Sequence, residues 1–263
     1  MWAPYSVQPV IVERAEHPDW LSNAYLVAEG GTGVLVDNNG AARPLYEQIE
    51  QQGIEITHIL LTHHHMDHVV GVAELKERFG VPVLAHEKAA AELDDGLVDQ
   101  TLGDGEKFST GDLRIDPLLT EGHAPGHLSY LFNGGDCITA DVLFKGTVGG
   151  TRAPGATGYA DLRASIMERL MQLPPETRIH PGHREPTSVK SEWESNPFIR
   201  VWRGLDEEGD EPCKVGEQEA RLILWAPDYD GTNKAWVRLP DGTDAIVGGS
   251  QVARPGSNPD PSI

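Results

Sequence analysis

The chain has 263 residues, enough to bury the core of one large domain, or of one domain with a small appendage. Its formal net charge of −20 at pH 7 disfavours nucleic acid and anionic membrane surfaces as partners, because both carry negative charge. A hydrophobic fraction of 39% and a charged fraction of 24% are ordinary for a globular protein and exclude wholesale disorder.

The cysteines and the amino terminus bear on the cellular compartment. Cys137 and Cys213 are the only cysteines and neither belongs to a CxxC pair, so neither a disulfide framework nor a thiolate zinc site is predicted. The first residues, from Met1 to Tyr5, lack a basic segment followed by an apolar run. No stretch reaches the roughly 18 apolar residues of a membrane span. We therefore expect a cytoplasmic protein with no membrane partner.

The first half of the chain is predicted to alternate strands with helices. Short β-branched and aliphatic runs indicate early strands at 10–12, 24–27 and 33–36. Residues 44–52 have a helical pattern, and 54–61 end apolar enough to predict a strand buried on both faces. Val72, Leu75 and Phe79 then recur at helical spacing, Gly80 ends that helix, and 81–84 restore a strand.

The middle of the chain continues the same pattern. Further strands are predicted at 113–118, 128–132 and 137–139. Leu162, Ile166 and Leu170 mark one face of a helix that ends before Pro174. These elements predict an α/β fold of mixed sheets with helices outside.

The composition changes near Gly204, where residues 205–212 are acidic and rich in turn formers. We place a boundary there, between a catalytic domain at 1–203 and an acidic linker with a small β-rich module at 204–263. Three strands are predicted in this tail, at 221–225, 235–239 and 245–247. Because three short strands form only a marginal sheet, we expect an apolar face to pack against the catalytic domain or a second subunit. That face comprises Leu222, Leu224, Trp225, Trp236 and Val237.

Histidines and one aspartate cluster between the buried strand at 54–61 and the following helix, in the run His63-His64-His65-Met66-Asp67-His68. The carboxyl end of a strand is where open α/β sheets place their sites. Residues two apart on an extended chain point the same way, so His63 and His65 can hold one ion. Asp67 and His68 are then free to face a second ion. An exposed histidine run such as a tag is disfavoured, because tags occupy chain termini.

The spacing His-x-His-x-Asp-His resembles the signature of the metallo-β-lactamase superfamily. Residues 121–127 resemble its second motif, 135–144 resemble the strand whose last aspartate bridges two metals, and 181–183 resemble the final ligand motif. The stretches 158–166 and 196–198 are similar to the glyoxalase II-like (hydroxyacylglutathione hydrolase-like) branch in particular. The resemblance covers roughly residues 22 to 203.

The resemblance implies a four-layer αβ/βα sandwich that binds two divalent metal ions, with zinc favoured and iron or manganese as alternatives. The implied ligands are His63, His65 and His123 for one ion, Asp67, His68 and His183 for the other, and Asp141 for both. A metal-bound hydroxide is the implied nucleophile, with Asp67 as the catalytic residue that orients it or accepts its proton. Asp37 resembles the family's early aspartate, which supports the metal loop without binding metal.

The function implied by the resemblance is hydrolysis of a thioester or related acyl ester of a small molecule. An iron-dependent persulfide dioxygenase, which shares the ligand set, and a lactone or phosphoester hydrolase are the alternatives. Lys145, Arg152 and Tyr159 are candidates to bind the substrate, although a solvated surface role explains the two cations equally well. The acidic stretch 204–219 argues against glutathione as the thiol carrier, and a homodimer is left open.

Overall fold

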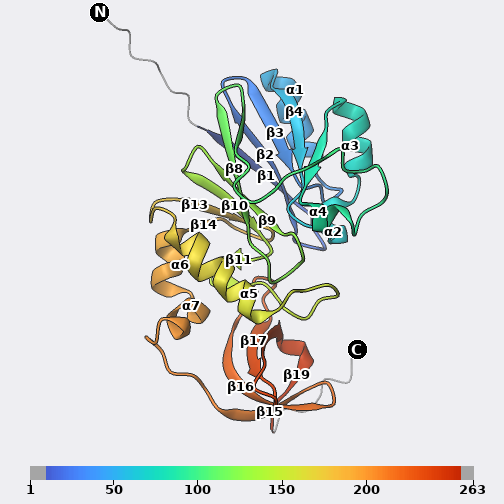
Figure 1. Ribbon diagram of the computed structural model, residues 1–263. Coiled ribbons are helices and arrows are strands. Elements are labelled where there is room, and N and C mark those ends of the chain that lie inside the picture. The colour runs from blue at the N-terminus through green and yellow to red at the C-terminus, as the bar shows by residue number, and fades with distance from the viewer. Residues whose placement is uncertain (1–9, 256–263) are drawn as a thin grey trace, which may run out of the picture. The chain divides into compact units, whose positions relative to one another are not determined.

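The computed structural model describes residues 10–255, so the amino-terminal segment interpreted above, Met1 to Tyr5, lies outside the described residues (Figure 1). The chain forms two compact units. The first comprises Met1–Leu119 and Leu128–Ile138, and the second comprises Thr120–His127 and Thr139–Ile263. Within residues 10–255, no helix combines the length and the apolar character needed to span a membrane. The boundary at residue 204 stays a prediction.

The first unit contains a six-stranded sheet whose spatial order follows the chain. Its strands are β1 (Ile11–Glu16), β2 (Asn23–Glu29), β3 (Thr32–Val36), β4 (Glu55–Leu60), β5 (Val83–Ala85) and β6 (Gln100–Thr101). The pairs β1–β2 and β2–β3 are antiparallel, and the pairs from β3 to β6 are parallel. Parallel neighbours need crossover connections, which is why helices separate β3, β4 and β5 along the chain.

The crossover helices are α1 (Arg43–Gln52), α2 (Met66–Val69) and α3 (Val72–Phe79), and α4 (Glu87–Ala90) follows β5. Pro44 stands in the first turn of α1, where its missing N–H costs no helical hydrogen bond. Gly80 ends α3 as predicted, and its N–H donates to the carbonyl oxygen of Lys76. The sequence patterns therefore located the two longer helices correctly.

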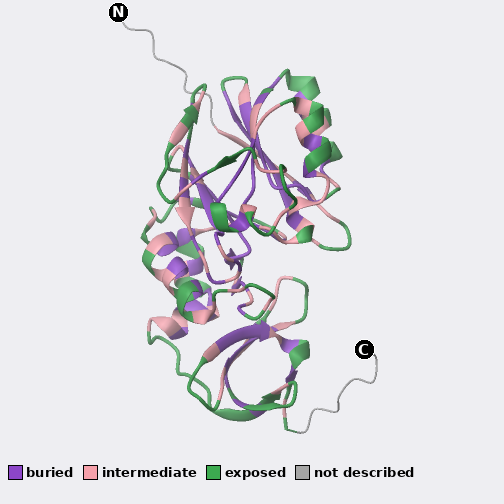
Figure 2. Cartoon of the chain, turned by 45° about the vertical axis from the view of Figure 1, so that its right-hand side comes forward, coloured by how far each residue is buried: buried purple, intermediate pink, exposed green. Residues whose placement is uncertain are grey.

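Both faces of this sheet are buried, as predicted for the strand at 54–61. On one face, Leu35 and Ile59 pack with Leu45 of α1 and Leu75 of α3. On the other face, Leu60 belongs to a cluster formed with a second sheet, including the side chains of Leu113, Tyr130 and Phe132. Figure 2 shows these buried stretches concentrated in the strands, with exposed residues on the outer sides of the helices. Burial on both sides explains why β4 has an apolar end.

The second six-stranded sheet has the order β14-β13-β10-β9-β8-β7. Three of its strands match predicted ones, namely β8 (Leu113–Leu119), β9 (Leu128–Phe132) and β10 (Asp136–Ala140). The sequence patterns did not reveal the others, which are β7 (Phe108–Thr110), β13 (Arg178–Pro181) and β14 (Thr187–Ser188). These three are short, so they offer too few residues for an alternating pattern.

The second unit contains the remaining helices and a small hairpin. Helix α5 (Tyr159–Ala164) continues through a π-helical turn, η1 (Ser165–Arg169), and a 3₁₀ turn, η2 (Leu170–Gln172). Leu162, Ile166 and Leu170 are fully buried, which confirms the predicted helical face. The other elements are the strands β11 (Leu143–Phe144) and β12 (Thr147–Val148) and the helices α6 (Val189–Ser195) and α7 (Pro197–Trp202).

The C-terminal sheet has five strands instead of the predicted three. They are β15 (Glu211–Val215), β16 (Gln218–Pro227), β17 (Asn233–Arg238), β18 (Asp244–Gly248) and β19 (Val252–Ala253), in the order β18-β17-β16-β15-β19, with a 3₁₀ turn, η3 (Gly249–Gln251), before the last. Figure 2 shows these strands curling round, with buried residues along them. Leu222 and Val237 pack into this sheet's own apolar cluster, so the prediction that they cover another surface is wrong. For Trp236 the prediction is confirmed, because its ring lies against Tyr159 of the predicted catalytic domain, with ring centroids 5.1 Å apart.

Candidate metal centre

The histidine run begins on the loop after β4 and ends in α2, and a buried aspartate holds it in place. Asp37, only 2% exposed, accepts hydrogen bonds from the N–H of Thr62 (2.8 Å) and from its hydroxyl (2.7 Å). Its Oδ2 also lies 2.9 Å from Nδ1 of His68. Burial raises the pKa of the Asp37 carboxyl, while the hydrogen bonds from His68 and Thr62 oppose that shift. Because Nδ1 of His68 contacts Asp37, its Nε2 is the nitrogen available to a metal ion.

His63 and His65 present one nitrogen each to the same place. Nε2 of His63 lies 3.1 Å from Nδ1 of His65, and Nδ1 of His63 lies 3.0 Å from the hydroxyl of Thr62. Two nitrogens bound to one tetrahedral ion at about 2.0–2.1 Å would be about 3.3 Å apart. The observed spacing therefore fits two ligands of one ion. Among the described residues, no group with metal-binding geometry includes His64, as expected from alternation along the chain.

His123 stands on a loop whose base is closed by two contacts between Thr120 and His127. The N–H of Thr120 donates to the carbonyl oxygen of His127 at 2.8 Å, and the hydroxyl lies 3.0 Å from Nδ1 of His127. Nδ1 of His123 lies 2.9 Å from the carbonyl oxygen of Gly150, to which it can donate. This contact orients the ring so that Nε2 is the nitrogen that can serve as the ligand atom.

Asp141 follows β10 directly and contacts two histidines through one oxygen. Its Oδ2 lies 3.5 Å from Nε2 of His123 and 3.4 Å from Nε2 of His183. Both distances match the separation of two ligand atoms on one ion, and each histidine belongs to a different predicted ligand set. Ala140 precedes this aspartate with φ +39°, a strained backbone conformation of the kind that clusters at functional sites. The arrangement fits a carboxylate that bridges two ions.

Two glycines allow the chain to approach these ligands closely. A Cβ at Gly149 would lie 2.0 Å from the carbonyl oxygen of Asp141 and 3.4 Å from Cβ of His123. At Gly122, which has φ +133°, a Cβ would lie 2.4 Å from the backbone of Leu162. Any side chain at either position would displace a ligand or the loop that carries it.

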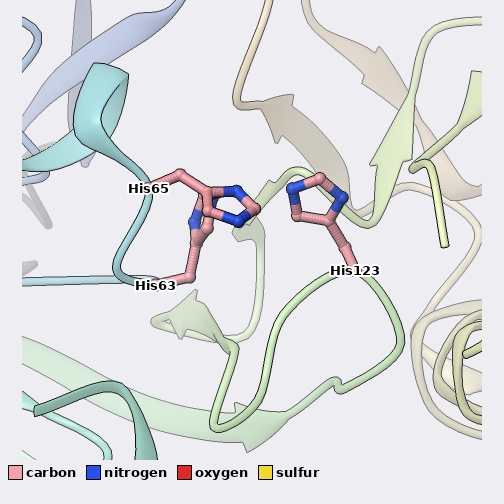
Figure 3. Close-up of side chains that lie close together, drawn as sticks. All are labelled: His63, His65 and His123. Carbon is pink, nitrogen blue, oxygen red and sulfur yellow. Dashed lines mark hydrogen bonds between the residues drawn. The ribbon is translucent and has the colours of Figure 1, made fainter. Parts of the chain in front are cut away.

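The seven predicted ligands all occur in groups whose ligand atoms lie within 4.8 Å of one another. The groups are His63, His65 and His123; His63, His68 and Asp141; and Asp67, His68 and His183. Figure 3 shows the imidazoles of the first group gathered together. Imidazole and carboxylate donors without thiolates suit zinc, iron or manganese. The residues present therefore fit two divalent ions, although ligation itself stays a prediction.

The three predicted substrate residues have different surroundings. The side chains of Lys145 and Arg152 are exposed. Tyr159 is half-buried, and its hydroxyl accepts a hydrogen bond from Nε1 of Trp202 at 2.9 Å. Burial raises the pKa of Tyr159, so its hydroxyl stays protonated. Their part in substrate binding stays a prediction.

Tyr229 is a residue near the centre that the sequence reading missed. Its ring stacks on the imidazole of His183, with centroids 4.4 Å apart and planes 17° from parallel. Phe144 meets the same imidazole edge-on at 5.8 Å. The sequence offers one sign of this role, a single tyrosine in the otherwise polar turn Asp228-Tyr229-Asp230-Gly231. A turn that is only solvated does not need an aromatic side chain.

The chain is similar to several known proteins. The chain is 31% identical over 199 residues to a probable metallo-hydrolase of Bacillus subtilis, a match covering 68% of this chain and 92% of that protein. It is 37% identical over 142 residues to a hydroxyacylglutathione hydrolase of Rhizobium meliloti, covering 54% of this chain and about half (53%) of that enzyme's length. The solved structure of TTHA1623 in a di-iron-bound form superposes with a TM-score of 0.59 at 34% identity, covering 70% and 98% of the two chains.

The family model described as the metallo-β-lactamase superfamily matches residues 17–183, a range that contains all seven predicted ligands. The two six-stranded sheets and their helices are those of its αβ/βα sandwich, which confirms the predicted fold class. The chain belongs to the metallo-β-lactamase superfamily.

Proposed function

We propose that this protein is a metal-dependent hydrolase that cleaves a thioester of a small molecule in the manner of glyoxalase II. The observation that carries the proposal is Oδ2 of Asp141, placed 3.5 Å from Nε2 of His123 and 3.4 Å from Nε2 of His183. A carboxylate shared in this way supports a pair of adjacent ions, which is an arrangement suited to hydrolysis. The similarity to hydroxyacylglutathione hydrolases supports a thioester as the substrate class.

Two divalent ions at this site would lower the pKa of water to about 7 and stabilise negative charge on a carbonyl oxygen. The half-buried carboxylate of Asp67 is then the base that takes a proton from the attacking water. The water oxygen bonds to the acyl carbon, the carbon–sulfur bond breaks, and the proton passes to the departing thiolate. The products are a carboxylic acid, which loses its proton to solvent at neutral pH, and a free thiol. We propose zinc as the metal, with iron as the alternative because of the di-iron relative.

Oxygen dependence separates this proposal from a persulfide dioxygenase. We expect protein purified under argon to release free thiol from a thioester, either a hydroxyacylglutathione or a thioester of another thiol, at the same rate with and without oxygen. The measurement combines metal analysis, a colorimetric thiol assay and an oxygen electrode, with glutathione persulfide as the second substrate. A thioester of a small uncharged thiol, run in parallel, tests whether the carrier must be anionic. Oxygen uptake with persulfide and no thiol release from either thioester would overturn the proposal.

With both metal sites kept saturated, Asp67→Asn should lower kcat for thioester cleavage by about 10²- to 10⁴-fold, because the amide cannot accept the proton. The KM should change little if the residue acts on the attacking water. Glu74→Gln, a change at an exposed position on α3, serves as the control for removal of a nearby charge. A kcat for Asp67→Asn within threefold of the wild-type value would exclude Asp67 as the base.

A further inference from the structure

We propose that Tyr229, from the C-terminal sheet, is a positioning residue that holds the His183 imidazole in its metal-binding orientation. The tail would then contribute to the metal centre without supplying a ligand. This inference rests on the metal centre alone and not on the identity of the substrate. Tyr229 belongs to the turn between β16 and β17, two strands that are labelled in Figure 1.

The ring contact constrains the direction in which His183 presents its nitrogen. Rotation of an imidazole about its Cβ–Cγ bond is broad, so a histidine ligand needs neighbours to set the plane of its ring. His183 is buried, and its imidazole lies nearly parallel to the phenol ring of Tyr229, 17° apart. Phe144 closes on the imidazole from the edge, with planes 65° apart. Tilting the ring away from Oδ2 of Asp141 would therefore require both aromatic rings to move.

Tyr229 is itself held by the turn that carries it. The N–H of Asp228 donates to the carbonyl oxygen of Thr232 at 3.0 Å, and the N–H of Gly231 donates back to Asp228 at 3.2 Å. Lys234 and Asp228 form an ion pair at 2.9 Å, with side chains 9% and 5% exposed. Burying two charges is costly unless their geometry is fixed, so this pair favours one conformation of the hairpin.

Two further contacts hold Tyr229 in place, one to its ring and one to its backbone. Nζ of Lys234 lies 5.4 Å from the centre of the Tyr229 ring, within the range of a cation–π contact. Nε of Arg184, the residue after His183, donates to the carbonyl oxygen of Tyr229 at 3.4 Å. The turn thus contacts the histidine and its chain neighbour through both ring and backbone. A purely structural aromatic cluster would stabilise the fold without altering metal affinity, and this difference can be measured.

The test uses the full-length protein stripped of metal and titrated with Co²⁺ or Zn²⁺ against a chelator, without substrate. In Tyr229→Leu, which removes the stacked ring but keeps an apolar side chain, one of the two ions should bind about three- to tenfold more weakly. Tyr229→Phe, which keeps the ring, should retain the wild-type affinities. His183→Ala identifies the affected ion, because it should abolish binding of that same ion. The d–d absorption spectrum of bound Co²⁺ should change in Tyr229→Leu and not in Tyr229→Phe.

Asp228→Asn provides a second variant that leaves Tyr229 in place and removes one charge of the buried pair. It should weaken the binding of the same ion that Tyr229→Leu affects. This result can be measured even if Tyr229→Leu does not fold well enough to be titrated. Wild-type affinities for both ions in Tyr229→Leu, or in Asp228→Asn if the former does not fold, would overturn the proposal. Equal weakening in Tyr229→Phe and Tyr229→Leu would also overturn it, because the hydroxyl and not the stacked ring would then be responsible.

Discussion

Replacing Asp141 with alanine is expected to weaken the binding of both metal ions at once. One oxygen of this carboxylate lies 3.5 Å from Nε2 of His123 and 3.4 Å from Nε2 of His183. Loss of a bridging ligand leaves each ion with one donor fewer and removes the negative charge that screens the two dications from each other. We expect hydrolysis to fall by at least about 10²- to 10³-fold, the range seen when a single electrostatic contact in an active site is removed.

Metal content after dialysis against a weak chelator, together with competition titrations, measures this effect directly. Asp95→Ala is the matched control, because Asp95 is an exposed aspartate outside the candidate centre. The control should keep two equivalents of metal and the wild-type rate. Retention of both ions with unchanged affinity in Asp141→Ala would show that this residue does not bridge, and the ligand division proposed for the seven residues would have to be abandoned.

The histidine-rich loop after β4 could be predicted from the sequence because its signals are local. The apolar end of β4, the alternation of His63 and His65, and the helix that follows are all properties of neighbouring residues. The approach of His123 and His183 to Asp141 is not local, since loops and strands far apart in the chain must come together. Spacing alone does not encode that proximity, and its prediction came from the family resemblance.

The C-terminal sheet shows where local patterns fail. The strand β15 begins inside a stretch that was interpreted as an acidic linker, and of its five residues only Cys213 is buried. Pairing with β16 and β19 along both edges, and not an apolar pattern of its own, makes this segment a strand. The same long-range packing gives the sheet its own core. The three strands predicted from the sequence indicate only a marginal sheet without such a core.

Tyr229 was missed for a related reason. A turn residue has no periodic neighbours, so its burial partner cannot be inferred from sequence. Asp37 is the opposite case, because the family resemblance indicates its supporting role. The structure shows that role in its hydrogen bonds to Thr62 and His68.

The second large effect is expected for Asp37→Asn, which removes no predicted ligand. The carboxylate accepts from the N–H and hydroxyl of Thr62 and contacts Nδ1 of His68, all at buried positions. An amide offers only one acceptor oxygen, and its NH₂ group would face a second donor. We expect metal affinity to fall about 10- to 100-fold. The metal-free protein should also lose about 1–3 kcal/mol in its free energy of unfolding.

Chelator competition and urea unfolding of the metal-free protein measure the two effects separately. Thr62→Val, which removes one hydroxyl donor and keeps the shape of the side chain, should weaken metal binding less than Asp37→Asn, because the contact with His68 remains. Asp37→Asn should have the larger effect because Asp37 holds Nδ1 of His68. Without that contact, Nε2 of His68 is not oriented toward the metal. If Asp37→Asn lost stability but bound both ions as tightly as the wild type, Asp37 would support the fold without orienting His68, and the hydrogen bond would have no role in the metal centre.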